Sequence, residues 1–259
     1  MSNDFAIIFD VDGTLSETEL DGHRVAFNKA FVDFGLDWDW SESLYGELLA
    51  VTGGKERIRY YIENWLTDFT VDGVTNDDEL AAYIAKIHAR KTELFVALLN
   101  DGVIGLRIGV ERLLRECIEN GVRIAIATTT TPANVTGLLT ATLGAASIDW
   151  FEVIAAGNDA AIKKPDPEIY HYALQHLGLQ ASQCIAIEDS QNGIRSSLAA
   201  GIPTLITVSE YTRKETFKGA LSVINHLGEP DMPLQLIAGA DIGSSFIDLD
   251  ALKRIHAEG

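Results

Sequence analysis

An apolar segment that ends in two aspartates constrains the fold of this chain more than any other feature. Residues 5–9 are Phe, Ala, Ile, Ile and Phe, and Asp10, Asp12 and Gly13 follow within four positions. A continuous run of large apolar residues is typical of a strand that is buried on both faces of a parallel sheet. In open α/β sheets, ligands bind in the crevice beyond the carboxyl ends of the strands. We therefore expect Asp10 and Asp12 to lie in a functional site.

The two aspartates also predict a bound cation. Acidic side chains this close repel each other unless one is protonated or a cation lies between them. Carboxylate oxygens suit a hard divalent cation, and we expect Mg²⁺. The alternative is a strand followed by an ordinary Asp-Gly turn, because short motifs also occur by chance.

Three later apolar segments also lead into polar residues. They cover residues 122–127, 152–156 and 184–187. The polar residues that follow them are Thr128, Lys164 and the pair Glu188 and Asp189. Helical patterns separate the segments, and this alternation predicts a doubly wound, Rossmann-like parallel α/β sheet. Because the carboxyl ends of parallel strands meet at one edge, we expect these residues to converge there.

The region between the first two predicted strands has a different character. Residues 18–100 carry helical patterns and almost no strand pattern. We expect them to form an inserted α-helical cap domain, with residues 1–17 and 101–259 forming the α/β core. Trp38 and Trp40 are expected to pack between cap helices.

Two clusters of positive charge stand out in the predicted cap. Residues 53–57 (Gly-Gly-Lys-Glu-Arg) place glycines and cations at a helix start, a pattern that binds anions. They do not form a Walker A loop, because no Ser or Thr follows Lys55. Residues 88–91 (His-Ala-Arg-Lys) form the second cluster. Either cluster could be a solvated helix surface, but together they favour a second phosphate-binding position.

Composition excludes several classes of partner. The net charge of −18 argues against nucleic acids and anionic membranes, which both require a basic surface. No segment is long and apolar enough for a membrane span, and the N-terminus lacks a signal-peptide pattern. Cys117 and Cys184 lie in apolar segments and are expected to be reduced core thiols. We expect a monomeric cytoplasmic protein.

Taken together, the motifs resemble those of the haloacid-dehalogenase-like phosphatases. The hexapeptide from Asp10 to Leu15 is similar to their first motif. The resemblance implies that Asp10 attacks phosphorus and forms an aspartyl-phosphate, while Asp12 protonates the leaving oxygen and then activates water. Thr128 would bind the phosphoryl group, and Lys164 would neutralise that group and Asp10. Mg²⁺ would be bound by Asp10, Asp12 and Asp189, with Glu188 as a ligand or an outer-shell group.

Several segments further resemble the CbbY-type branch. They include residues 52–58, 91–98, 127–130, 163–165 and 188–193. That branch contains xylulose-1,5-bisphosphate phosphatases, so the resemblance implies a small sugar substrate with two phosphates and the product xylulose 5-phosphate. The residues implied to contact the sugar and distal phosphate are Glu19, Tyr45, Gly53, Gly54, Lys55, Glu56, Arg57, His88, Ala89, Arg90 and Lys91. Those implied to surround the phosphate that is cleaved, besides Thr128, are Thr129, Thr130 and Asn134.

Parts of the chain depart from the family pattern or carry less signal. Residues 18–23 are one residue longer than that pattern, so the role of Glu19 could fall on a neighbour. The loop Arg107-Ile108-Gly109 lacks a proline, which we expect to change only its stiffness. We expect His23 to be a packed or exposed helix residue rather than a catalytic helper. The residues after Glu210 are expected to form a peripheral helix and strand, and residues 211–213 could border the site.

Three alternative functions stay open. A sugar phosphomutase related to the β-phosphoglucomutases would use the same aspartyl-phosphate but transfer it to a second sugar hydroxyl. A phosphatase could act on another small ester, such as phosphoglycolate. A non-catalytic sugar-phosphate-binding protein is disfavoured, because every side chain that the reaction needs is present.

Overall fold

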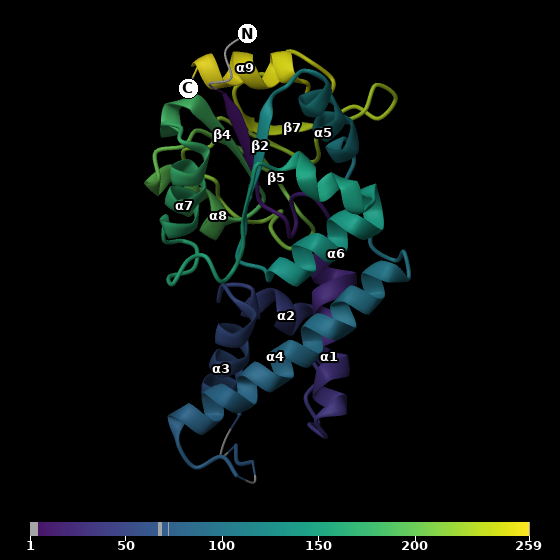
Figure 1. Ribbon diagram of the computed structural model, residues 1–259, viewed down its shortest axis with the longest axis vertical. Coiled ribbons are helices and arrows are strands. Elements are labelled where there is room, and N and C mark those ends of the chain that lie inside the picture. The colour runs from purple at the N-terminus through teal and green to yellow at the C-terminus, as the bar shows by residue number, and fades with distance from the viewer. Residues whose placement is uncertain (1–4, 67–68, 72, 259) are drawn as a thin grey trace.

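A seven-stranded sheet organises one half of the molecule in the computed structural model, which describes residues 5–66, 69–71 and 73–258 (Figure 1). The strands are β1 (Ala6–Phe9), β2 (Arg123–Ala127), β3 (Val153–Ala155), β4 (Cys184–Glu188), β5 (Thr204–Thr207), β6 (Ser222–Ile224) and β7 (Leu236–Gly239). Their order is β3-β2-β1-β4-β5-β6-β7, and only the β6–β7 pair is antiparallel. The predicted doubly wound α/β fold is confirmed. Positions 1–4, 67, 68, 72 and 259, which we assigned to the core or the cap, lie outside the described residues.

Helices cover both faces of this sheet, because alternate strand residues face opposite sides. Ile7 and Phe9 of β1 contribute to one hydrophobic cluster, and Ala6 and Ile8 contribute to another. The first face carries α5 (Val110–Glu119), α6 (Pro132–Leu143) and α9 (Leu249–Glu258), and the second face carries α7 (Glu168–Leu177) and α8 (Gln191–Ala199). Two short 3-10 helices, Ala145–Trp150 and Ala181–Gln183, complete this half. Cys117 and Cys184 are buried and free.

The C-terminal stretch is less peripheral than the sequence predicts. Leu252 and Ile255 of α9 belong to the main hydrophobic cluster and are almost completely buried. Strand β6 extends the parallel sheet and is buried throughout. The expectation of a peripheral helix and strand is therefore wrong for α9 and β6. The reason is that the apolar residues of α9 recur on one helical face, which packs onto the sheet.

The second half of the molecule is a helical unit with its own core. It consists of a π-helix (Glu19–His23), α1 (Arg24–Asp33), α2 (Glu42–Leu48), α3 (Gly54–Trp65) and α4 (Asp77–Asn100). Trp38 and Trp40 pack into the aromatic core of this unit, as predicted. The Asn76 side chain caps α4 by accepting a hydrogen bond from the Glu79 amide (3.0 Å). Helix α4 then runs along α6 and joins the two halves (Figure 1).

Two connections lie side by side between the halves. Ser16 leads out of the sheet and forms a β-bridge with Leu106, which leads back into it. Arg107 fixes the return connection, because its guanidinium donates to the carbonyls of Thr207, Val208 and Asn225. The helical unit thus meets the carboxyl edge of the sheet, where β1, β2 and β4 end. Within the described residues, no helix is long and apolar enough to cross a membrane.

Candidate active site

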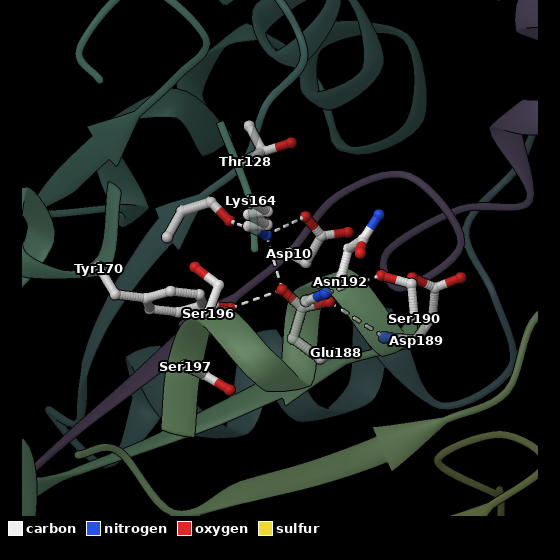
Figure 2. Close-up of polar contacts among 12 residues, drawn as sticks. Asp10, Thr128, Lys164, Tyr170, Glu188, Asp189, Ser190, Asn192, Ser196 and Ser197 are labelled. Atoms are coloured by element: carbon white, nitrogen blue, oxygen red, sulfur yellow. Dashed lines mark hydrogen bonds and ion pairs between the residues drawn. The ribbon is translucent and has the colours of Figure 1, made fainter. Parts of the chain in front are cut away.

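A buried lysine joins two carboxylates at the carboxyl edge of the sheet. Asp10 follows β1, and Glu188 ends the neighbouring strand β4. The Lys164 ammonium donates to Asp10 Oδ1 at 2.7 Å, to Glu188 Oε1 at 2.6 Å and to the Ala127 carbonyl at 2.8 Å. Figure 2 shows this amino group between the two carboxylates. All three of its hydrogens therefore have partners, which fixes both acids relative to β2.

Burial dominates the electrostatics of this cluster. It raises the pKa of Asp10 to about 8, since Lys164 only partly offsets burial and the nearby charges of Glu188 and Asp12. The pKa of Asp189 is raised well above its ordinary value, first by burial and then by Asp10 and Glu188. Burial would lower the pKa of Lys164, but Asp10 and Glu188 raise it, so this lysine stays protonated. The cluster has more acidic groups than one ammonium can neutralise.

A hard divalent cation fits this surplus of acidic oxygens. Asp10, Glu188 and Asp189 each place a carboxylate oxygen within 4.8 Å of the others. A side chain at Gly13 would overlap the Asp189 carboxylate, so glycine leaves room for that acid. Oxygen-only ligands of this kind suit Mg²⁺. Glu188 is the least available ligand, because Lys164 and the Tyr170 hydroxyl (2.6 Å) both bind its Oε1 (Figure 2).

Asp12 has a separate set of partners from the helical unit. Its Oδ1 accepts a hydrogen bond from the Thr18 hydroxyl (2.5 Å) and lies 2.8 Å from His23 Nε2. His23 Nδ1 lies 2.7 Å from the Lys91 ammonium. A protonated lysine only donates, so Nδ1 accepts and Nε2 carries the hydrogen that faces Asp12. Burial would raise the pKa of Asp12, but His23 and Thr18 hold it well below its ordinary value.

The π-helix explains how His23 reaches Asp12. The segment that is one residue longer than the family pattern forms this π-helix, which spans Glu19–His23. Such a turn accommodates an extra residue within a helix. The wider turn lets Glu19 face the cavity while the buried His23 faces Asp12. His23 is packed, as expected, and its ring also contacts Asp12, which the sequence did not predict.

Two adjacent cavities surround these groups. The larger, about 620 Å³, lies between the helical unit and the loop after β2. The smaller, about 400 Å³, is lined by Asp10, Thr128, Lys164 and Asp189. Residues that line both are Asp12, Glu19, Arg57 and Thr129. Because Glu19 and Arg57 belong to the helical unit, this unit and the acidic cluster line the smaller cavity together.

The first cationic cluster of the helical unit faces this space. Arg57 is buried and donates to the Tyr45 hydroxyl at 2.9 Å and to the Leu48 carbonyl at 3.2 Å. The Tyr45 hydroxyl in turn donates to Glu19 at 2.5 Å. Lys55 lines the larger cavity at the start of α3, where Gly53 (φ +97°) provides no side-chain cap for the first amides. These amides and cations are suited to an anion.

The second cluster divides between the cavity and the surface. His88, Ala89 and Lys91 line the larger cavity. Burial and the charges of Lys91 and Lys55 lower the pKa of His88 to about 3, so its imidazole is neutral. Burial also lowers the pKa of Lys91 to about 8, although Asp12 and Glu19 act in the opposite direction. Arg90 does not line either cavity; its guanidinium binds Asp33 and Glu93 at 2.7 and 2.8 Å.

The loop after β2 supplies polar groups to both cavities. The Thr128 hydroxyl accepts a hydrogen bond from the Thr130 amide (3.3 Å). Asn134 is buried, and its side-chain amide donates to the Thr130 hydroxyl at 2.8 Å. Among the described residues, the carbonyl oxygen of the Asn134 side chain has no hydrogen-bond partner. This loop therefore presents ready hydrogen-bonding groups beside Asp10.

Most residues that the sequence singled out meet at this site. Those that line a cavity are Asp10, Asp12, Glu19, Gly53, Gly54, Lys55, Glu56, Arg57, His88, Ala89, Lys91, Thr128, Thr129, Thr130, Asn134, Lys164 and Asp189. Tyr45 and Glu188 lie directly behind the cavity wall, through the hydrogen bonds described above. Arg90 alone of the predicted set points elsewhere. Sequence reasoning gave no role to Thr18, and it missed Tyr170, whose hydroxyl binds Glu188 from an otherwise apolar helical stripe.

Comparison with known proteins agrees with this geometry. The family model for haloacid dehalogenase-like hydrolases matches residues 6–201. The plasmid CbbY protein of Cupriavidus necator is 45% identical over 255 residues, which cover 97% of this chain and 96% of that protein. CbbY of Rhodobacter capsulatus is 48% identical over 215 residues, covering 83% and 90% respectively.

Solved structures give the same result. The crystal structure of CbbY from Rhodobacter sphaeroides in complex with phosphate has a TM-score of 0.78 and 43% identity, covering 86% of this chain and 94% of that one. A mutant of that protein, in complex with xylulose-(1,5)bisphosphate, has a TM-score of 0.78 and 42% identity over the same shares. A β-phosphoglucomutase from Clostridium difficile, with 20% identity and a TM-score of 0.71, shares the fold. The chain therefore belongs to the haloacid dehalogenase-like hydrolases and, within them, to the CbbY-type phosphatases.

Proposed function

We propose that this enzyme removes one phosphate from a sugar bisphosphate, and that its substrate is xylulose-1,5-bisphosphate, which gives xylulose 5-phosphate. One observation carries the proposal: the acidic cluster and the cations Lys55, Arg57 and Lys91 line two adjacent cavities, and Arg57 lines both of them. A substrate with two phosphates uses both regions at once. The complex of a CbbY mutant with xylulose-(1,5)bisphosphate supports this substrate. The volumes of about 620 and 400 Å³ suit a small sugar phosphate.

Asp10 is the proposed nucleophile. Its Oδ1 is held by Lys164, which leaves the other carboxylate oxygen for attack on phosphorus in line with the leaving oxygen. The new bond joins Asp10 to phosphorus, and the bond between phosphorus and the sugar oxygen breaks. Lys164 and the Thr128 hydroxyl line the same cavity and stabilise charge on the phosphoryl oxygens. A divalent cation held by Asp10, Asp12 and Asp189, with Glu188 behind them, would neutralise the acids and polarise the phosphoryl group.

Asp12 is the proposed acid and base. A phosphate dianion that binds beside it raises its pKa by like-charge repulsion, so that Asp12 can carry the proton for the leaving sugar oxygen. Once that proton has left, the His23 hydrogen bond (2.8 Å) again favours the carboxylate. The carboxylate then takes a proton from the water that attacks the phosphorus of the aspartyl-phosphate and releases inorganic phosphate. His23 holds the Asp12 oxygen in place throughout, because Lys91 fixes its ring from the other side.

The helical unit acts as the proposed cap. Thr18 and His23 contact Asp12 from this unit, and Lys91 holds the His23 ring, while Asp12 itself belongs to the sheet half. Asp12 therefore has its full set of partners only when the unit lies against the sheet. Binding energy from the distal phosphate at Lys55 and Arg57 can favour that closed arrangement, so recognition far from the reacting atoms selects the substrate.

Release of phosphate from a panel of esters tests the proposal. The panel contains xylulose-1,5-bisphosphate, ribulose-1,5-bisphosphate, phosphoglycolate and β-glucose 1-phosphate, each with Mg²⁺ or with EDTA. We expect Mg²⁺-dependent release with a strong preference for the first ester. A preference for another ester would reject the substrate and keep the reaction. Isomerised glucose phosphate with little free phosphate would instead identify a mutase.

A further inference from the structure

A short loop after β5 connects the acidic cluster with the helical unit. At its start, Ser209 lies beside Asp189: a side chain at Gly13 would overlap the Asp189 carboxylate and lie 3.1 Å from Ser209 Cβ. Two residues later, the Tyr211 ring contacts the Tyr45 ring edge to face, with centroids 5.9 Å apart. Both Ser209 and Tyr211 line the smaller cavity. The loop therefore spans the distance from the acids to helix α2.

The loop is held firmly in this position. The Thr212 hydroxyl accepts a hydrogen bond from the Ser209 amide at 2.9 Å and lies 3.0 Å from the Ser209 hydroxyl. At its base, Arg107 donates to the carbonyls of Thr207 and Val208 at 2.9 and 2.6 Å. These bonds tie Tyr211 to the sheet half, although its ring contacts the helical unit.

Helix α2 leaves room for the Tyr211 ring. A side chain at Gly46 would lie 3.1 and 3.3 Å from two carbons of that ring. Glycine inside a helix lowers stability by about 1 kcal/mol relative to alanine. The close contact with the Tyr211 ring explains why glycine occupies this position. The ring therefore rests on α2 beside Tyr45, whose side chain is completely buried.

Tyr45 links the Tyr211 ring to the substrate cavity through hydrogen bonds. Its hydroxyl donates to Glu19 and accepts from Arg57, and both partners line both cavities. A shift of the Tyr45 ring would move these two groups together. The Tyr211 hydroxyl is buried and has no hydrogen-bond partner within the described part of the chain, so the ring rather than the hydroxyl makes the interaction.

We propose that Tyr211 is a positioning residue that sets Glu19 and Arg57 through Tyr45, and so determines the preference for a sugar bisphosphate over esters without a sugar. This inference rests on the proposed function, because Glu19 and Arg57 matter only for a substrate that extends beyond the phosphate that is cleaved. Because Ser209 of the same loop lies beside Asp189, the loop also fixes the position of Tyr211 relative to Asp189.

The test compares two substrates in four proteins. Wild type, Tyr211→Ala, Tyr211→Phe and Tyr60→Ala are assayed with xylulose-1,5-bisphosphate and with acetyl phosphate, which has one phosphate and no sugar. We expect Tyr211→Ala to lower kcat/KM for the bisphosphate by about three- to tenfold, mainly through KM, which matches the loss of one aromatic pair. Acetyl phosphate hydrolysis should change by less than about twofold. Tyr211→Phe keeps the ring and should match the wild type on both substrates. Tyr60→Ala should also match it, because Tyr60 is an exposed residue of α3 that lies outside both cavities.

Equal losses on both substrates, or no loss for Tyr211→Ala, would overturn the inference. Gly46→Ala provides a second variant that displaces the ring without removing it, and it should lower the same preference. A wild type that does not prefer the bisphosphate rejects the proposed function instead. In that case, acetyl phosphate is compared with whichever sugar phosphate the wild type hydrolyses best. Equal losses on both substrates, or no loss for Tyr211→Ala, would again overturn the inference.

Discussion

Replacing Lys164 with methionine removes the charge that holds the acidic cluster together and keeps a side chain of similar shape. The ammonium has contacts of 2.7 Å to Asp10 and 2.6 Å to Glu188, and both acids are buried. Without Lys164 and without a cation, the buried carboxylate of Glu188 loses its counter-charge beside Asp189. This loss of compensation sets the size of the effect.

The magnitude follows from the cost of removing one partner of a buried ion pair, which is roughly 3–5 kcal/mol. Burial disfavours the charged form of an acid, and it already raises the pKa of Asp10 and of Asp189. Acids whose pKa is raised in the folded state favour folding at low pH, so the uncompensated cluster should be destabilised less at pH 5 than at pH 7. We expect a loss of about 4 kcal/mol at pH 7 and a clearly smaller loss at pH 5.

Denaturation in EDTA at pH 5, 6, 7 and 8 measures this loss. At pH 7 it corresponds to a decrease in Tm of about 8–16 °C for a protein of this size. Lys163→Met is the matched control, because that lysine donates to the Gly157 and Ala160 carbonyls and to neither acid of the cluster. It should cost about 1 kcal/mol, with no dependence on pH. A loss for Lys164→Met that stays constant from pH 5 to 8 would refute the electrostatic reasoning.

Four further predictions concern the same site. Because the pKa of Asp10 is raised to about 8, the free energy of unfolding of the wild type in EDTA should fall between pH 4 and 8 more steeply than that of Asp10→Asn. Denaturation of both proteins measures this difference. Added Mg²⁺ should abolish it. Asp10→Asn should also have no phosphatase activity, and an active variant would reject Asp10 as the nucleophile. Above pH 8, kcat/KM for the sugar bisphosphate should decrease as Lys91 loses its charge, and this limb should be missing from the pH profile of Lys91→Met. Gly193→Ala should destabilise the protein by about 1–3 kcal/mol in urea denaturation, because the new methyl group overlaps the Glu188 carboxylate. Gly137→Ala is the control, because the nearest neighbour of its new methyl group is a leucine side chain at 3.3 Å. Its free energy of unfolding should stay within about 1 kcal/mol of the wild-type value.

The strand-end residues were predictable because their signal is local. Asp10 and Thr128 follow an apolar run directly, and Asp189 follows one after Glu188. Parallel pairing of β1 with β2 and β4 brings the ends of these runs together. Lys164 lies after β3 in a long loop, and its contact with Asp10 could be expected only from the family resemblance. The sheet order itself was left open by the sequence, because apolar strands of similar composition do not specify their neighbours.

The groups that the sequence did not predict depend on helix orientation. Arg90 and Lys91 are adjacent, but successive residues point about 100° apart on a helix, so one faces Asp33 and the other faces His23. Tyr170 follows an apolar pattern typical of a core aromatic, and only the packing of α7 places its hydroxyl at Glu188. The contact of His23 with Asp12 was not predicted, because it depends on a π-helix, which does not follow the 3.6-residue period of an α-helix.

The central position of β1 also has a consequence for folding. This strand is synthesised before its partners β2 and β4, which begin at residues 123 and 184. At roughly 5–20 residues per second, about ten seconds or more pass between β1 and β4. The helical unit can form within that time, because its aromatic core, among the described residues, lies within positions 27–94 apart from Tyr211 at its margin. Until β4 is synthesised, one edge of β1 has no partner strand, and an unpaired apolar strand edge is prone to aggregation.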